Sequence, residues 1–200
     1  KILDLRSYAE GRDAKGEVSV TNYIAFSLYG TDDKYIVGAV ANARQASKFY
    51  PGWKVIFFCG QDVSVDVLNK LQSYGAETVI VTGMTGFASA AWRFQASFIL
   101  DAEAVIFRDA DSRLSFREAK AVADWLASEK AIHVMRDHPN HKWEVQAGMF
   151  GILPKRLPRF LRKLANEKFG DYYGQDQDFL RRALYYPNRL NCYINDDFAL

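Results

Sequence analysis

Residues 104–112 read Ala-Val-Ile-Phe-Arg-Asp-Ala-Asp-Ser, a short apolar run that ends in two carboxylates one residue apart. Such a run predicts a buried strand that delivers Asp109 and Asp111 to the carboxyl edge of a sheet. Carboxylates placed there can share a divalent cation, because Mg²⁺ and Mn²⁺ prefer oxygen ligands and are often held by one or two carboxylates together with phosphates. The stretch therefore predicts a metal–diphosphate site, and its alternative is a solvated turn that caps the next helix.

The context of this pair decides between the two interpretations. The chain has 16 Asp in 200 residues, so an Asp-x-Asp pattern is expected about once by chance. A second one occurs at Asp176 and Asp178. Downstream of the first, Ser115 and Glu118 form a capping box, so the following helix has a cap of its own and the two aspartates are not needed for that role.

The composition describes an ordinary globular domain. Its 49% hydrophobic content over 200 residues suits one core without disulfides or structural metal, and the net charge of +2 argues against a nucleic-acid partner bound by a broad basic surface. Cys59 and Cys192 show no metal-binding spacing, so we expect two reduced thiols of a cytoplasmic protein, with a single disulfide as the alternative. No apolar run could span a bilayer, and the N-terminus shows no signal-peptide pattern.

Continuous apolar strands alternate with amphipathic helices through the first half of the chain. Strands are expected at 23–29, 55–59, 79–81 and 104–107, with helices between them. This rhythm is typical of a mostly parallel central sheet flanked by helices, an α/β, Rossmann-like architecture. In the second half the rhythm breaks, with strands expected at 131–135 and 145–153 and a helix over 157–164.

Two further expectations concern the boundaries and the surface. Residues 1–21 are expected to be an arm or leader and residues 22–200 one domain. The chain could also be one domain of a longer protein. Residues 155–182 hold eight Lys or Arg and four Asp or Glu, which is most often a solvated face. An acidic acceptor or peripheral association with the cytoplasmic face of a membrane are the alternatives.

Taken together, several motifs resemble those of GT-A-fold glycosyltransferases. The similarity is to polysaccharide enzymes of bacteria and large viruses and, more distantly, to retaining galactosyltransferases of family eight, and it covers roughly residues 22–198. The motifs are residues 26–29, Trp-Arg-Phe at 92–94, Arg-Asp-Ala-Asp-Ser-Arg-Leu at 108–114, Met-Arg-Asp-His-Pro at 135–139, Ala-Gly-Met-Phe-Gly at 147–151 and Asp-Gln-Asp-Phe-Leu at 176–180.

The resemblance implies a nucleotide-binding half over about residues 22–112 and an acceptor half over about residues 113–200. It also implies a metal and donor site. Asp109 and Asp111 would bind Mn²⁺ or Mg²⁺ against the donor diphosphate, with Asp109 and Ala110 near the nucleotide. Arg93 would bind the donor, and its alternative is a salt bridge on a helix surface. The segment 26–29 would hold the base, most readily uridine, by backbone contacts and aromatic stacking. The predicted donor contacts in that segment are Phe26, Ser27, Leu28 and Tyr29, whose alternative role is ordinary core.

The resemblance also implies a sugar and acceptor site. Asp176 would bind sugar hydroxyls and Gln177 would lie beside the anomeric carbon. Since an amide is a poor nucleophile, a front-face route with retention is expected, in which the leaving phosphate accepts the acceptor's proton. The alternative for these residues is an acidic helix N-terminus. Gln146 would contact donor sugar or acceptor, and Asp137 and His138 would line the sugar or acceptor pocket.

The chain departs from the family near its C-terminus. Where the family commonly places a third metal ligand, a histidine, this sequence has Asn195. Asn195 could bind the cation through its carbonyl oxygen, or Asp196, Asp197 or water could replace it. His138 and His141 lack the context of a zinc site, and His133, inside an apolar strand, is expected to be a core or edge residue.

The sequence thus predicts a metal-dependent glycosyltransferase that moves a sugar from a UDP-sugar to a glycan acceptor in surface polysaccharide or glycoprotein glycan synthesis. One alternative is a nucleotidyltransferase acting on sugar phosphates. Such enzymes usually carry a Gly-rich basic loop after the first strand, whereas residues 27–34 contain one Gly and one Lys. The other is a catalytically inactive domain that binds nucleotide sugars.

Overall fold

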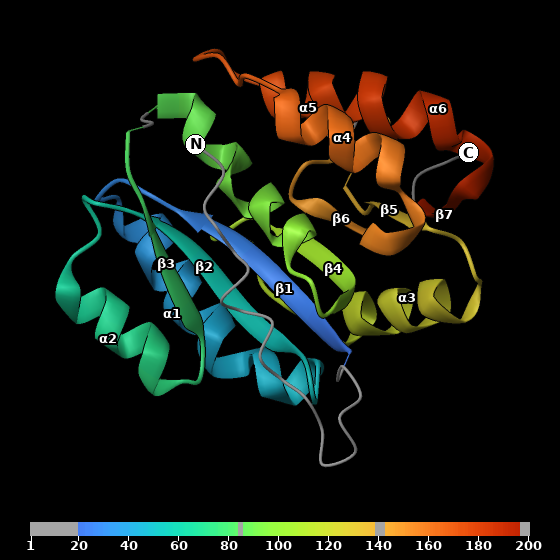
Figure 1. Cartoon of the computed structure of the whole chain (residues 1–200). Helices are drawn as coiled ribbons and strands as arrows, with labels where there is room; N and C mark the ends of the chain where they lie inside the picture. Colours follow the sequence, from blue (N-terminus) through green and yellow to red (C-terminus); the bar gives the residue numbers. More distant parts are fainter. Residues whose placement is uncertain (1–19, 84–85, 139–142, 197–200) are drawn as a thin grey trace.

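The computed structural model describes residues 20–83, 86–138 and 143–196, and within these ranges one seven-stranded sheet forms the centre of the molecule (Figure 1). The strand order is β3-β2-β1-β4-β6-β5-β7, and of these strands β6 alone runs against the others. The strands are β1 (Thr21–Leu28), β2 (Lys54–Gly60), β3 (Glu77–Val81), β4 (Ala102–Arg108), β5 (Ile132–Arg136), β6 (Met149–Ile152) and β7 (Cys192–Asp196). The predicted mostly parallel α/β sheet is confirmed.

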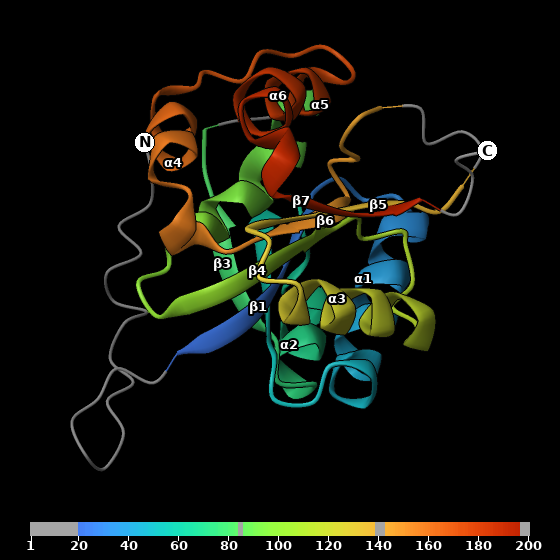
Figure 2. The same ribbon diagram turned by 90° about the vertical axis from the view of Figure 1, so that its right-hand side faces the viewer.

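Helices cover both faces of the sheet, as Figures 1 and 2 show. One face carries α1 (Asp33–Phe49), α2 (Val65–Ser73) and α3 (Phe116–Ala127). The other carries the 3-10 helix η2 (Gly86–Phe98), α4 (Pro158–Asn166) and α5 (Gln175–Leu180), which continues into the π-helical turn η4 (Arg181–Tyr185). The short turns η3 (Pro154–Arg156), α6 (Tyr186–Asn188) and η5 (Arg189–Asn191) complete the connections.

Two hydrophobic clusters, one on each side of the sheet, explain why the central strands are continuously apolar. In β1, Tyr23 and Ala25 belong to the cluster under η2, whereas Ile24, Phe26 and Leu28 belong to the cluster under α1 and α2. Successive side chains of a strand point to opposite faces, so a strand covered on both sides is expected to be almost continuously apolar. The same alternation decides which residues at the end of β1 can face a ligand.

The capping box at the start of α3 is present in one half. The Ser115 hydroxyl accepts a hydrogen bond from the Glu118 N–H at 3.2 Å, as predicted. The Glu118 carboxylate instead pairs with the fully buried Arg108 at the end of β4. This ion pair ties α3 to the strand that carries the acidic motif.

One predicted strand is shorter in the structure. Residues 145–148, expected to be the start of a strand over 145–153, form a turn closed by a hydrogen bond from Met149 N–H to Gln146 O at 3.0 Å. The reason is the position of Gly148, whose backbone lies against the Asp109 carboxylate beyond the end of β4. Strand pairing with β4 begins only at Met149, opposite Arg108.

Some of the residues named in the sequence predictions are not among those that the structure describes. Residues 1–19 of the expected arm, Pro139, His141 and Asp197 lie outside the described residues.

Both cysteines are free, and burial raises the pKa of the Cys59 thiol to about 12. None of the helices in the described ranges is long and apolar enough to cross a membrane.

Candidate functional site

The loop after β4 carries the acidic motif at the carboxyl edge of the sheet, and α1 holds it in place. The fully buried Asn42 side chain donates hydrogen bonds to Ala110 O at 3.3 Å and Ser112 O at 3.0 Å, and its oxygen accepts one from Leu114 N–H at 3.2 Å. A Cβ at Gly38, one turn earlier, would lie only 2.1 Å from Ala110 O. These contacts fix the backbone around Asp109 and Asp111.

Sequence reasoning missed Asn42 and Gly38, although a signal was present. Both lie on the buried face of α1 among Ala39, Ala43 and Ala46. An amide on an otherwise apolar helix face must find hydrogen-bond partners, because an unsatisfied buried polar group costs free energy. Such a residue indicates that the helix supports a loop.

Arg93, from η2, connects three parts of the site. Its side chain is 4% exposed, which excludes the alternative of a helix-surface salt bridge. The guanidinium donates to Asp109 Oδ1 at 2.5 Å and to Arg108 O at 3.0 Å, and it lies 3.5 Å from Asp176 Oδ2. Burial lowers the pKa of Arg93, but the charges of Asp109 and Asp176 outweigh that effect and raise it. Arg93 is therefore a permanent buried cation.

Lys34, at the start of α1, forms an ion pair with the other carboxylate of the motif. Its Nζ lies 2.5 Å from Asp111 Oδ2, and the hydrogen bond between them raises the pKa of Lys34. Tyr29, directly after β1, lines the same cavity as Lys34, and its ring forms a T-shaped pair with that of Trp92, with centroids 5.8 Å apart. Burial raises the pKa of the Tyr29 hydroxyl, although the Arg93 charge opposes this.

The predicted sugar-binding residues lie at the start of α5. Gly174 precedes the helix with a φ of +84°, and Asp176 is 8% exposed. The Asp176 Oδ1 accepts a hydrogen bond from the Gln177 N–H at 2.9 Å, which leaves Oδ2 facing Arg93. Of the Asp-Gln-Asp motif, Asp176 is thus the residue that contacts Arg93, as expected for a residue of the site.

Several buried polar atoms around this point have no hydrogen-bond partner among the described residues. They are Arg93 Nε, Gln146 Nε2, both side-chain polar atoms of Gln175, and Gln177 Oε1. Native proteins rarely leave buried polar groups unpaired, so a cluster of them indicates the place of a polar ligand or bound water.

One cavity of about 370 Å³ is lined by half of the predicted site residues, together with Lys34 and Gln175, which were not predicted. Its lining includes Tyr29, Lys34, Arg93, Asp109, Asp111, Gln146, Gln175, Asp176 and Gln177. A neighbouring cavity of about 360 Å³ is lined by Ser27, Tyr29, Arg93, Asp109 and Ala110 among others, and a third of about 320 Å³ by Asp109, Asp137, His138 and Gln146. Asp109 is common to all three, so it lies where they meet.

Three predicted residues are placed elsewhere. Phe26 and Leu28 are buried on the α1 side of the sheet, where Phe26 stacks on Phe57 with ring centroids 4.7 Å apart. Their side chains therefore do not face the cavities, and the predicted aromatic stacking rests on Tyr29. Asn195 lies in β7, three strands from β4, with its Oδ1 2.8 Å from His133 Nε2. Adjacent strands are about 4.8 Å apart, so the structure does not bring Asn195 together with Asp109 and Asp111.

The carboxylates of Asp109 and Asp111 suit a cation that is also bound by phosphate oxygens. Within the described residues, no group of three or more His, Cys, Asp and Glu side chains is gathered to hold a metal. Mg²⁺ and Mn²⁺ are commonly bound by one or two carboxylates plus substrate phosphates rather than by a complete protein cage. Asp109 and Asp111 fit that mode of binding.

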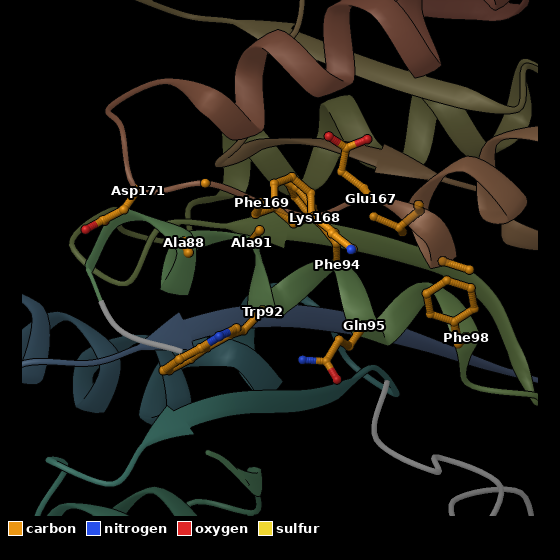
Figure 3. A pocket seen from close by; sticks show the side chains of 13 residues that line it. Ala88, Ala91, Trp92, Phe94, Gln95, Phe98, Glu167, Lys168, Phe169 and Asp171 are labelled. Atoms are coloured by element: carbon orange, nitrogen blue, oxygen red, sulfur yellow. The ribbon is translucent and has the colours of Figure 1, made fainter. Parts of the chain in front are cut away.

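Another cavity, of about 470 Å³, lies between η2 and the segment after α4 (Figure 3). Phe94 and Phe169 approach it from these two elements, and Asp171 stands at one end. None of the predicted site residues lines it. It is therefore separate from the candidate site, although Asp171 also lines the neighbouring cavity of about 360 Å³.

Comparison with known proteins gives the fold its context. No protein-family model matches the chain, and no curated protein sequence matches it significantly. Among solved structures it is similar to glucosyl-3-phosphoglycerate synthase from Mycobacterium tuberculosis, with a TM-score of 0.59 and 14% identity over 100% of this chain and 78% of that chain. A complex of that enzyme with Mn²⁺, uridine-diphosphate-glucose and phosphoglyceric acid gives 0.57 and 13% over 98% and 73%.

The chain is also similar to 4-diphosphocytidyl-2C-methyl-D-erythritol synthase from Anaerococcus prevotii, with a TM-score of 0.57 and 10% identity over 88% of this chain and 89% of that chain. At these identities the likeness shows the fold alone. It confirms the predicted GT-A, Rossmann-like architecture of a single α/β domain.

Proposed function

We propose that this chain is a glycosyltransferase that takes its sugar from a nucleotide sugar with the help of Mn²⁺ or Mg²⁺. The observation that carries the proposal is the cavity of about 370 Å³, where the Asp109 and Asp111 carboxylates and the buried Arg93 face unpaired amide groups. Carboxylates with a cation and an arginine suit a diphosphate, whereas amides suit the neutral hydroxyls of a sugar.

The chemistry follows from where charge develops. Breaking the bond between the anomeric carbon and the diphosphate leaves negative charge on the departing nucleotide. The bound cation, held by Asp109 and Asp111, would neutralise part of that charge. Arg93 needs no reorganisation to add a second positive group, since Asp109 and Asp176 already hold it.

Gln146, Gln175 and Asp176 would orient the sugar through its hydroxyls, with Gln177 beside the anomeric carbon. Because an amide is a poor nucleophile, we propose a front-face reaction with retention. The acceptor oxygen forms the new bond on the side that the phosphate leaves, and its proton passes to the leaving phosphate. Asp137 and His138 share a cavity with Asp109 and Gln146 and would contact the glycan acceptor.

The donor and the setting are also proposals. UDP-sugar is the favoured donor, supported by the structural likeness to an enzyme crystallised with Mn²⁺ and uridine-diphosphate-glucose. Ser27, Tyr29 and Ala110 line the adjoining cavity and would hold the nucleoside. We place the reaction in surface polysaccharide or glycoprotein glycan synthesis, in the cytoplasm. The exposed cations Arg159, Arg162 and Lys163 on α4 could support contact with an anionic membrane face.

A nucleotidyltransferase acting on sugar phosphates is the second candidate. The similar fold of 4-diphosphocytidyl-2C-methyl-D-erythritol synthase favours it. Against it, residues 27–34, from the end of β1 to the first turn of α1, contain one Gly and one Lys and no Gly-rich basic sequence. Product analysis separates the two, because a glycosyltransferase releases nucleoside diphosphate from a nucleotide sugar whereas a nucleotidyltransferase produces pyrophosphate from a nucleoside triphosphate.

The test combines binding and turnover. We expect UDP to raise the melting temperature in the presence of Mn²⁺ and less so without it, and one nucleotide sugar to release UDP slowly. Asp111→Asn should abolish the additional rise in melting temperature that UDP produces when Mn²⁺ is present. The matched control is Asp124→Asn, which also removes a carboxylate paired with a lysine, Lys120, at 2.6 Å but lies on α3. Stabilisation by no nucleotide would refute the proposal, and the anomeric configuration of the product tests retention.

A further inference from the structure

The ion pair between Lys34 and Asp111 occupies an oxygen that the proposed cation needs. Lys34 Nζ lies 2.5 Å from Asp111 Oδ2, and both residues line the cavity that also contains Arg93 and Asp109. A positive group of the chain itself therefore sits at the edge of the candidate metal site.

The two cations of this cavity are held very differently. Arg93 is 4% exposed and contacts Asp109, Asp176 and a backbone carbonyl, so it cannot leave without unpairing buried charges. The Lys34 side chain is 63% exposed, and it contacts Asp111 and the ring of Tyr35, 5.2 Å away. Exposed ion pairs contribute little, and an ammonium on a flexible stem can change partner easily.

The position of Lys34 gives it a natural second partner. It lies in the first turn of α1, directly after the loop that follows β1, where the end of the helix dipole also favours negative groups. A diphosphate that shares a cation with Asp109 and Asp111 would bring phosphate oxygens within reach of the same cavity. An ammonium displaced from Asp111 would then find a new acceptor without leaving the site.

We propose that Lys34 exchanges partners when the donor binds: the divalent cation takes Asp111, and the released ammonium binds the donor diphosphate. This inference rests on the proposed function and adds to it a diphosphate-binding residue. When the nucleotide is absent, Lys34 would compete with the cation for the Asp111 carboxylate. When the cation is present, it would strengthen binding of the nucleotide.

This dual role predicts opposite effects of one substitution. In Lys34→Met, Mn²⁺ alone should bind about two- to sixfold more tightly, as expected for removal of a competing exposed ion pair. UDP at saturating Mn²⁺ should bind about tenfold more weakly, because a charge-assisted hydrogen bond to phosphate is lost. Free Mn²⁺ can be followed by electron paramagnetic resonance and UDP binding by calorimetry.

Two further variants serve as controls. Lys34→Arg retains a cation that can pair with carboxylate and phosphate, so both affinities should stay close to those of the wild type. Lys120→Met removes an exposed lysine paired with Asp124 at 2.6 Å, away from the site, and should change neither affinity. A merely structural role of Lys34 would weaken both ligands together.

The outcomes distinguish this inference from the proposed function. Tighter binding of Mn²⁺ together with weaker binding of UDP in Lys34→Met, and neither change in Lys34→Arg, supports the exchange of partners. Unchanged or weaker Mn²⁺ binding, or unchanged UDP binding, overturns the exchange while the proposed function stands. If the wild type binds neither Mn²⁺ nor UDP, the proposed function fails and the exchange fails with it.

Discussion

His133 should make the stability of this protein depend on pH between about 4 and 6.5. It lies in β5 with 0% exposure, stacked on Trp125 with ring centroids 5.4 Å apart, and its Nε2 lies 2.8 Å from Asn195 Oδ1. Burial, helped by the charge of Arg108, lowers the pKa of His133 from 6.5 to about 4, while the contact with Asn195 acts in the opposite direction.

The sign and the size follow from this difference in pKa. Between pH 6.5 and 4 the unfolded chain binds a proton on His133 and the native chain does not, so the free energy of unfolding falls as the pH falls. One pKa unit corresponds to about 1.4 kcal/mol, so the full loss is about 3 kcal/mol, with about 2 kcal/mol already lost at pH 5. Above pH 7 both states are neutral at this position and the effect vanishes.

The assay is urea unfolding of the wild type and of His133→Gln at pH 7.5 and pH 5.0. Glutamine can still donate to Asn195, and any fixed loss of packing cancels when each protein is compared with itself. We expect the wild type to lose about 2 kcal/mol more than the variant between the two pH values. An equal loss in both proteins would show that His133 does not carry the pH dependence, and the reasoning from its burial would be refuted.

Two other substitutions test how the site is built. In Gly148→Ala the new Cβ would lie 1.9 Å from Asp109 Oδ2, so the carboxylate must move. We expect the metal-dependent stabilisation by UDP to be lost in a thermal-shift assay while far-ultraviolet circular dichroism stays unchanged; retained stabilisation would show that the position of Asp109 is not critical. In Asn42→Ala the loop 110–114 loses three hydrogen bonds, which should reduce the free energy of unfolding by about 2–3 kcal/mol in chemical denaturation. A loss below about 0.5 kcal/mol would mean that the loop is held by other contacts.

The sequence predicted the sheet well because its strands are recognisable from the apolar character of short stretches of the chain. Continuous apolar runs such as 55–59 and 104–107 are typical of strands buried on two faces, and Asp109 then falls at the carboxyl edge of the sheet by topology. The face to which each side chain points was harder to see. Phe26 and Tyr29 were assigned the same role, yet odd and even positions of β1 point to opposite sides, and only the position of η2 decides which side is the cavity.

Long-range contacts were the part that the sequence could not supply. Asn42 and Asp109 are far apart in the chain, and nothing local shows that α1 lies beneath the loop after β4. Residues 145–148 look like a strand because they are partly apolar, but close approach of Gly148 to Asp109 overrides that preference. Similarly, the place of Asn195 depends on the pairing of β7 with β5 at the far edge of the sheet.

The reversed direction of β6 has a consequence for how this fold could vary. In a fully parallel sheet, only segments that follow strands arrive at the ligand edge. Here β5 ends at that edge and β6 starts from it, so both ends of their connection, at Asp137 and at Gly148, stand beside Asp109. Exchanging that one connection would change the surface beside Asp109 without replacing a strand. The inversion thus gives the fold one connection that is joined to the sheet at both of its ends and that lies next to the acidic motif.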